Sequence, residues 1–178
     1  PGEKFHYSDT GYILLGEIIE RTAGMPMGRA VRELVGFDRL GIRHTYFETL
    51  DVVPPGTPPM AHQYADSTDL NDFDPSLDLY GGGGLVSTLE DLALFYRALV
   101  RGEVFKQRET LDLMLAVTPQ STGDRPGGYG MGIGASTVES VVCYGHSGFW
   151  GTTARYCPAL DLTVVGAVNQ MSEAGGTL

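Results

Sequence analysis

The spacing of the apolar residues changes once along the chain, near Gly128. Before this point they recur three and four residues apart in several segments, which predicts amphipathic helices. After it they alternate with other residues or form short runs between turn residues, which predicts strands. We therefore predict an α+β fold in one domain over residues 1–178, with a mainly helical lobe over about 1–127 and an antiparallel meander of four strands over about 128–170.

Start and stop residues place the individual elements. The predicted helices run from a cap at Ser8 or Asp9 to about Gly24, over about 26–40, from the capping box at 87–90 to Gly102, and over about 108–115. The predicted strands begin at Gly128 and continue at 138–144, 152–157 and 162–168. Residues 51–80 are rich in Pro, Asp and Gly and are long for a structureless loop, so we expect them to form a functional rim or a wrapping segment.

Composition excludes several classes of partner. The net charge is −10, which argues against nucleic acid and against anionic membrane surfaces. Apolar runs stay well short of the 18 residues that a membrane span requires. The chain begins with Pro1-Gly2 rather than Met, so we expect it to be a piece of a longer protein whose signal region, if any, is not included.

Two cysteines lie in the predicted sheet. Folding the hairpin about Trp150 places Cys143 opposite Cys157, so a cross-strand disulfide is geometrically possible in an oxidising compartment. The alternative is a pair of buried thiols, which general burial habits favour. Both readings remain open, and the spacing of the two residues does not match a metal site.

Several segments partly match a functional motif but are better explained as ordinary turns, strands or solvated loops. The segment 145–149 departs from the nucleophile elbow G-x-S-x-G at Phe149 and leads into a strand instead of a helix. The segment 130–135 has the spacing of a dinucleotide-binding loop, but no helix follows it, so a strand with one face bare of side chains is the better interpretation. The segment 81–84 lacks the Lys-Ser/Thr of a P-loop and indicates a turn or a close backbone crossing before a helix. The carboxylates of 66–78 lack the Gly and Glu of an EF-hand, and the four histidines show no metal-ligand spacing. We therefore expect no metal and no cofactor.

For two segments we still predict a functional role. The segment 143–152 is a predicted hairpin in which His146, Ser147 and backbone N–H groups lie where one strand ends, a rigid place to present them to a ligand. Tyr7 precedes a predicted helix N-terminus, where the positive end of the helix dipole favours a phenolate that can act as a base. An ordinary tyrosine beside a Ser/Asp cap is the alternative for this second segment.

Four stretches in the same order resemble the serine β-lactamase-like hydrolases, a group that includes class C β-lactamases, D-alanyl-D-alanine carboxypeptidases and related esterases. They are residues 1–20 around Tyr7-Ser8-Asp9, 40–47, 82–92, and Gly145-His146-Ser147-Gly148, which matches the His-x-Gly form of the family's third motif. The resemblance extends from residue 1 to about 170. It implies a partial β-lactamase/transpeptidase-like fold with a periplasmic or extracellular parent.

The resemblance also implies roles for individual residues. Tyr7 would be the proton-transfer partner of the nucleophile, His146 would line the strand edge, and the N–H of Phe149 would be one of two oxyanion donors. Substrate would contact Asp9, Ser147 and Gly148. Asp9 stands where the family usually has Asn, and a carboxylate cannot donate a hydrogen bond to a carbonyl as an amide can.

The family nucleophile is the Ser of S-x-x-K, and this chain does not contain that motif. Pro1 lies three residues before Lys4, and Glu103 lies three residues before Lys106, the only two lysines. We therefore expect the nucleophile upstream and predict that the chain alone is inactive. The implied substrates are a β-lactam, a D-Ala-D-Ala or peptidoglycan-like peptide, or another small amide or ester. The alternatives are a binding or regulatory module without a nucleophile, and a fragment that complements a separate N-terminal piece or forms oligomers.

Overall fold

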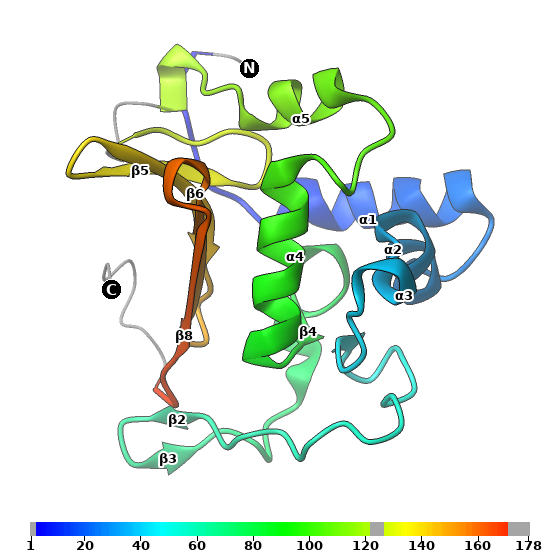
Figure 1. Cartoon of the computed structure of the whole chain (residues 1–178). Coiled ribbons are helices and arrows are strands. Elements are labelled where there is room, and N and C mark those ends of the chain that lie inside the picture. The colour runs from blue at the N-terminus through cyan, green and yellow to red at the C-terminus, as the bar shows by residue number, and fades with distance from the viewer. Residues whose placement is uncertain (1–2, 122–126, 171–178) are drawn as a thin grey trace.

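The computed structural model describes residues 3–121 and 127–170. Helix α4 lies along one face of a four-stranded sheet, and α1, α2 and α3 lie on the other side of α4 (Figure 1). The helices are α1 (Thr10–Ala23), α2 (Met27–Val35), α3 (Phe37–Leu40), α4 (Leu89–Arg101) and α5 (Arg108–Leu115). Helices combined with an antiparallel sheet confirm the predicted α+β class.

The sheet is a simple meander. Its strands are β5 (Gly134–Val138), β6 (Val141–Ser147), β7 (Thr152–Cys157) and β8 (Leu162–Ala167). They pair antiparallel in chain order, with Tyr144 opposite Tyr156 and His146 opposite Ala154. The face that carries Tyr156 packs with Leu99 and Val100 of α4 to form the buried core. Four strands in a meander confirm the topology expected from the sequence.

The cysteines lie on the other face of this sheet and form the disulfide that the sequence left open. Cys143 and Cys157 follow the Tyr144–Tyr156 pair in the register, and their Cα atoms are 4.1 Å apart. Both residues are buried. The bond therefore joins β6 to β7 on the two strands that lead into and out of the 148–151 turn.

Three predicted boundaries are wrong, each for a local reason. The helix expected over 26–40 is two helices, because Gly36 takes the left-handed conformation (φ 79°) and ends α2. Helix α4 is capped by Thr88, whose hydroxyl accepts from the N–H of Asp91, instead of the Ser87–Glu90 capping box. The first strand begins at Gly134, because the N–H of Gly130 donates to Ile133 O (2.8 Å) and closes a turn.

The segment 51–80 contains short structure of its own. Its parts are the paired strands β2 (Tyr64–Ala65) and β3 (Thr68–Asp69), followed by the 3₁₀ turn η1 (Pro75–Asp78). A second 3₁₀ turn, η2 (Tyr80–Gly82), crosses α1 so closely that a Cβ on Gly81 would overlap the carbonyl of Tyr12. This confirms the close backbone crossing predicted for the glycine run. The strands β1 (Tyr46–Phe47) and β4 (Leu85–Val86) pair on either side of this segment.

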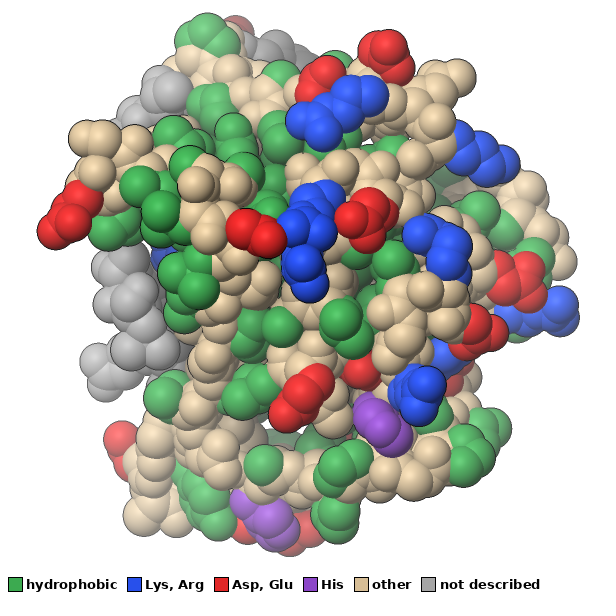
Figure 2. Space-filling view, in the orientation of Figure 1, with side chains coloured by type: hydrophobic (Ala, Val, Ile, Leu, Met, Phe, Trp, Pro, Cys, Tyr) green, Lys and Arg blue, Asp and Glu red, His purple; other side chains and the backbone are tan. Residues whose placement is uncertain are grey.

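The surface charges are mixed. On the face shown in Figure 2, Lys and Arg side chains lie among Asp and Glu side chains instead of forming a patch of their own. In residues 3–121 and 127–170, the helices lack the length and apolar character that a membrane span requires.

Candidate active site

The 148–151 turn presents an unused backbone donor. The N–H of Gly148 donates to Thr152 O (2.7 Å), and the N–H of Gly151 donates to Gly148 O (3.1 Å). Gly151 has φ 84°, which a residue with a Cβ rarely adopts. Among the described residues, the N–H of Phe149 has no hydrogen-bond partner. The turn therefore has a free donor at the end of β6, with the Phe149 side chain 53% exposed beside it.

Tyr7 and His146 meet at this strand end. The centroids of their rings are 6.3 Å apart, with an angle of 34° between the ring planes. Tyr7 is 43% exposed, so its ring is open to solvent on one side. The structure thus brings together the two side chains that the sequence placed, respectively, before the first helix and at the end of a strand.

Tyr129 completes this group, and the sequence did not single it out as a functional residue. Its buried ring lies 6.1 Å from that of Tyr7 and 5.7 Å from that of His146, edge to face in both pairs. The buried Ser121 bonds to the backbone of Tyr129, because its hydroxyl contacts Tyr129 O (2.7 Å) and accepts from the N–H of Tyr129 (3.3 Å). The alternation of glycines around Tyr129 predicted that it lies in a strand. Nothing in that local pattern indicated that its ring would contact Tyr7 and His146.

Asp9 is placed beside the glycine run. Its carbonyl accepts from the N–H groups of Tyr12 and Ile13, which starts α1, but its side chain makes no capping hydrogen bond. Asp9 therefore occupies the predicted N-cap position of α1, but it caps the helix through its backbone and not through its side chain. A Cβ added at Gly82 would lie 3.5 Å from the Cβ of Asp9, and Asp9 is exposed to solvent.

Ser147 and Gly148 occupy the strand end in different ways. Ser147 alternates with His146 along β6, so its side chain lies on the other face of the sheet, where its hydroxyl is 3.1 Å from that of Thr153. Gly148 contributes backbone only, and a Cβ there would contact Thr152 Oγ1 at 2.7 Å. The Ser147 side chain is thus not gathered with Tyr7 and His146.

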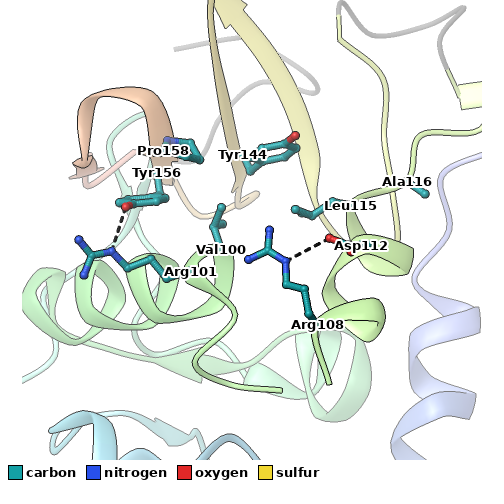
Figure 3. A pocket seen from close by; sticks show the side chains of 9 residues that line it. All are labelled: Val100, Arg101, Arg108, Asp112, Leu115, Ala116, Tyr144, Tyr156 and Pro158. Atoms are coloured by element: carbon teal, nitrogen blue, oxygen red, sulfur yellow. Dashed lines mark hydrogen bonds and ion pairs between the residues drawn. The ribbon is translucent and has the colours of Figure 1, made fainter. Parts of the chain in front are cut away.

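A separate hollow of about 680 Å³ lies between α4, α5 and the sheet (Figure 3). Its lining residues are Val100, Arg101, Arg108, Asp112, Leu115, Ala116, Tyr144, Tyr156 and Pro158. Its two arginines already have partners, since Arg108 pairs with Asp112 and Arg101 bonds to the hydroxyl of Tyr156. This hollow lies toward the end of β7 away from the 148–151 turn, so the hairpin end remains the candidate site.

Comparison with known proteins identifies the family. A family model described as Beta-lactamase matches residues 1–177. The chain belongs to the beta-lactamase family. This confirms the resemblance of the four sequence stretches.

The proteins similar to this beta-lactamase-family chain include two named as hydrolases and one named as a penicillin-binding protein. A putative D-alanyl-D-alanine carboxypeptidase from Escherichia coli K12 is 27% identical over 201 residues, which cover 93% of the chain and 45% of that protein. The D-amino acid amidase from Ochrobactrum anthropi SV3 superposes with a TM-score of 0.80 at 27% identity, covering 99% of the chain and 53% of the amidase. A penicillin-binding protein from Bacillus halodurans gives 0.74 at 26% identity, covering 98% and 54%.

The shared fold is a partial one. The chain spans about half the length of the relatives that it matches. Mixed helices and an antiparallel sheet in the β-lactamase/transpeptidase arrangement are therefore established for this portion, together with membership of a serine hydrolase family.

Proposed function

We propose that this chain is the part of a serine acyl-transfer hydrolase that supplies proton transfer and one oxyanion donor. The observation that carries the proposal is the contact of the Tyr7 and His146 rings, 6.3 Å apart, at the end of the strand that leads into the turn with the unpaired N–H of Phe149. A base and an oxyanion donor at one place are what acyl transfer requires, apart from the nucleophile.

The nucleophile in this proposal is the serine of an S-x-x-K segment upstream of the chain. Its oxygen attacks the substrate carbonyl carbon while Tyr7 takes its proton, and the N–H of Phe149 stabilises the resulting oxyanion. Tyr7 then passes the proton to the leaving nitrogen or oxygen as the C–N or C–O bond breaks. Water hydrolyses the acyl-enzyme and restores the serine.

The substrate class follows from the relatives and from Asp9. The relatives are named for D-alanyl-D-alanine peptides, D-amino acid amides and penicillin. We therefore propose a small amide, a peptide of this kind or an ester as substrate. Asp9 would contact it as a hydrogen-bond acceptor, which favours a substrate that offers an N–H at that position.

Covalent labelling tests the proposal. The isolated 178-residue chain should not be labelled by a fluorescent penicillin, whereas the chain extended by its upstream S-x-x-K segment should be labelled and should hydrolyse D-phenylalanine amide. In the extended protein, Tyr7→Phe should lower kcat by about 10²–10⁴-fold, because the proton loses its acceptor. Tyr144→Phe, in the separate hollow, is the matched control and should leave kcat within a small factor.

Two outcomes would contradict the proposal. A label that survives denaturation on the isolated chain would place a nucleophile within it. An upstream segment without S-x-x-K would instead favour the non-catalytic binding module, and a separately produced polypeptide that co-purifies with the chain would favour fragment complementation.

A further inference from the structure

The hairpin of β2 and β3 is fastened to the end of the sheet that carries the candidate site. The N–H of Tyr64 donates to Asn169 O (3.2 Å), and the Gln170 side chain donates to Asp66 O (3.2 Å). In Figure 1 this hairpin lies beyond the end of β8, although it is far from β8 in the sequence. The segment 51–80 is therefore bound to the residues that directly follow β8, through one backbone bond and one side-chain bond.

Gln63 extends this attachment to the 148–151 turn itself. Its side-chain amide donates to Trp150 O (2.7 Å) and to Val168 O (3.3 Å). Its own backbone is held on both sides, since its N–H donates to Asn71 Oδ1 (2.8 Å) and its carbonyl accepts from the N–H of Leu70 (2.8 Å). A side chain fixed in this way places its two N–H groups with little freedom.

The turn is also held through two of its carbonyl groups, those of Trp150 and Gly151. Gln63 binds the carbonyl of Trp150, and the N–H of Val168 donates to Gly151 O (3.0 Å). The bond from the Gly151 N–H to Gly148 O closes the turn, so the peptide groups on both sides of Phe149 and Trp150 move together. Rotation of the Trp150–Gly151 peptide would therefore also redirect the N–H of Phe149.

We propose that Gln63 is a positioning residue that fixes the direction of the Phe149 N–H. It acts through the Trp150 carbonyl and does not touch substrate. The catalytic consequence rests on the proposed function, because it requires the Phe149 N–H to be an oxyanion donor. The effect of Gln63 on the direction of the Phe149 N–H does not rest on the proposed function, because it concerns only the conformation of the 148–151 turn.

Amide spectra of the isolated, ¹⁵N-labelled chain test the effect of Gln63 on the turn. Gln63→Leu and Gln63→Glu both remove the side-chain donor at pH 7, so each should shift the Phe149 and Gly151 amide resonances and speed hydrogen exchange at Gly151 about tenfold or more. Gln63→Lys keeps a donor of similar reach and should restore both readouts. The exposed Gln107→Leu is the matched control and should leave both unchanged.

Two outcomes would overturn the effect of Gln63 on the turn. If Gln63→Leu lowers the melting temperature while the Phe149 and Gly151 amides stay unchanged, Gln63 only anchors the rim. If the three Gln63 variants behave alike, the donor is not what matters.

Kinetics of the chain extended by the S-x-x-K segment test the catalytic part. Gln63→Leu should lower kcat about tenfold with little change in KM, a fraction of the loss expected from deleting an oxyanion donor, and Gln63→Lys should recover most of it. An unchanged kcat together with shifted amides overturns the catalytic role. If the extended protein is inactive with Gln63 intact, the proposed function has failed, and the amide spectra still decide the positioning role.

Discussion

Asp161 joins the sheet to helix α4 through a single carboxylate oxygen. That oxygen accepts from the hydroxyl of Tyr156 (2.8 Å) and from the guanidinium of Arg101 (2.6 Å), and Arg97 lies at 3.9 Å. The Tyr156 hydroxyl, followed by Arg101, lowers the pKa of Asp161 below its ordinary value of 3.8. One residue in the turn before β8 thus connects the two layers.

The lowered pKa predicts how stability depends on pH. The folded state keeps Asp161 ionised to a lower pH than the unfolded chain does, so its contribution is complete above pH 3.8 and is lost as the pH falls through the lowered pKa. The Asp161 side chain is 54% exposed, so solvent screens part of this contribution. Asp161→Asn should therefore lower the melting temperature at pH 7 by a small amount and reduce the acid loss of melting temperature. Thermal unfolding followed by circular dichroism from about pH 7 to pH 3 measures both effects.

Asp112→Asn provides the comparison for this experiment. Its ion pair with Arg108 lies within α5, and both side chains are 61% exposed, so solvent screens it. We expect a small change in melting temperature at every pH. Identical pH profiles for Asp161→Asn and the unaltered chain would refute the role of Asp161.

Single residues differ in whether the sequence around them gives any signal of their contacts. Tyr7 and His146 were singled out because each sits at a recognisable boundary, before a helix and at the end of a strand. Tyr129 and Gln63 carry no such local signal. Their partners come from distant parts of the chain, and only the folded structure brings them together.

At the scale of elements, the disulfide fixes the register of the hairpin that ends at the candidate site. It closes a loop with a sequence separation of 14 between Cys143 and Cys157, and a one-residue slip would place His146 on the wrong face. The two strands are therefore held covalently on one face and by α4 on the other.

Removing the disulfide should destabilise the chain. A loop of this length predicts a loss of about 3 kcal/mol in the free energy of unfolding for Cys143→Ala/Cys157→Ala, because the unfolded chain regains conformational freedom. Urea denaturation measures the loss, and a reductant should lower the stability of the unaltered chain toward that of the variant. If reductant has no effect and the intact mass shows two free thiols, the bond does not form in solution.

Element types were predictable from the sequence, and their ends less so. Apolar spacing gave the helices and the four-stranded meander, because each is decided by residues close together in the chain. The expected strand start at Gly128 was wrong because residues 130–133 form a turn, closed by the bond from the Gly130 N–H to Ile133 O. The break at Gly36 depends on a backbone conformation that glycine permits but does not require.

At the scale of the whole molecule, helix α1 leaves a broad apolar surface uncovered. Only Gly16 of this helix is buried in the described structure. Four large apolar side chains on it are between 46% and 61% exposed: Ile13, Leu14, Leu15 and Ile18. Several exposed large apolar side chains on one helix favour association.

We therefore predict that the isolated chain self-associates. Size-exclusion chromatography with light scattering should give a mass that rises with concentration, and Leu14→Glu/Ile18→Lys should return it to that of a monomer by placing charges on the surface. Leu113→Glu, at an exposed position of α5, is the control and should not prevent association. A constant monomer mass over a wide concentration range would refute the prediction.

The contacts of the candidate site differ in how far apart in the sequence their two partners lie. Each strand from β5 to β8 pairs with its neighbour in the chain through a short connection, so closing these loops costs little entropy. The 148–151 turn can therefore form early and locally. Tyr7 and His146 lie far apart in the sequence, so the contact between their rings closes a much longer loop at a higher entropic cost than the turn does.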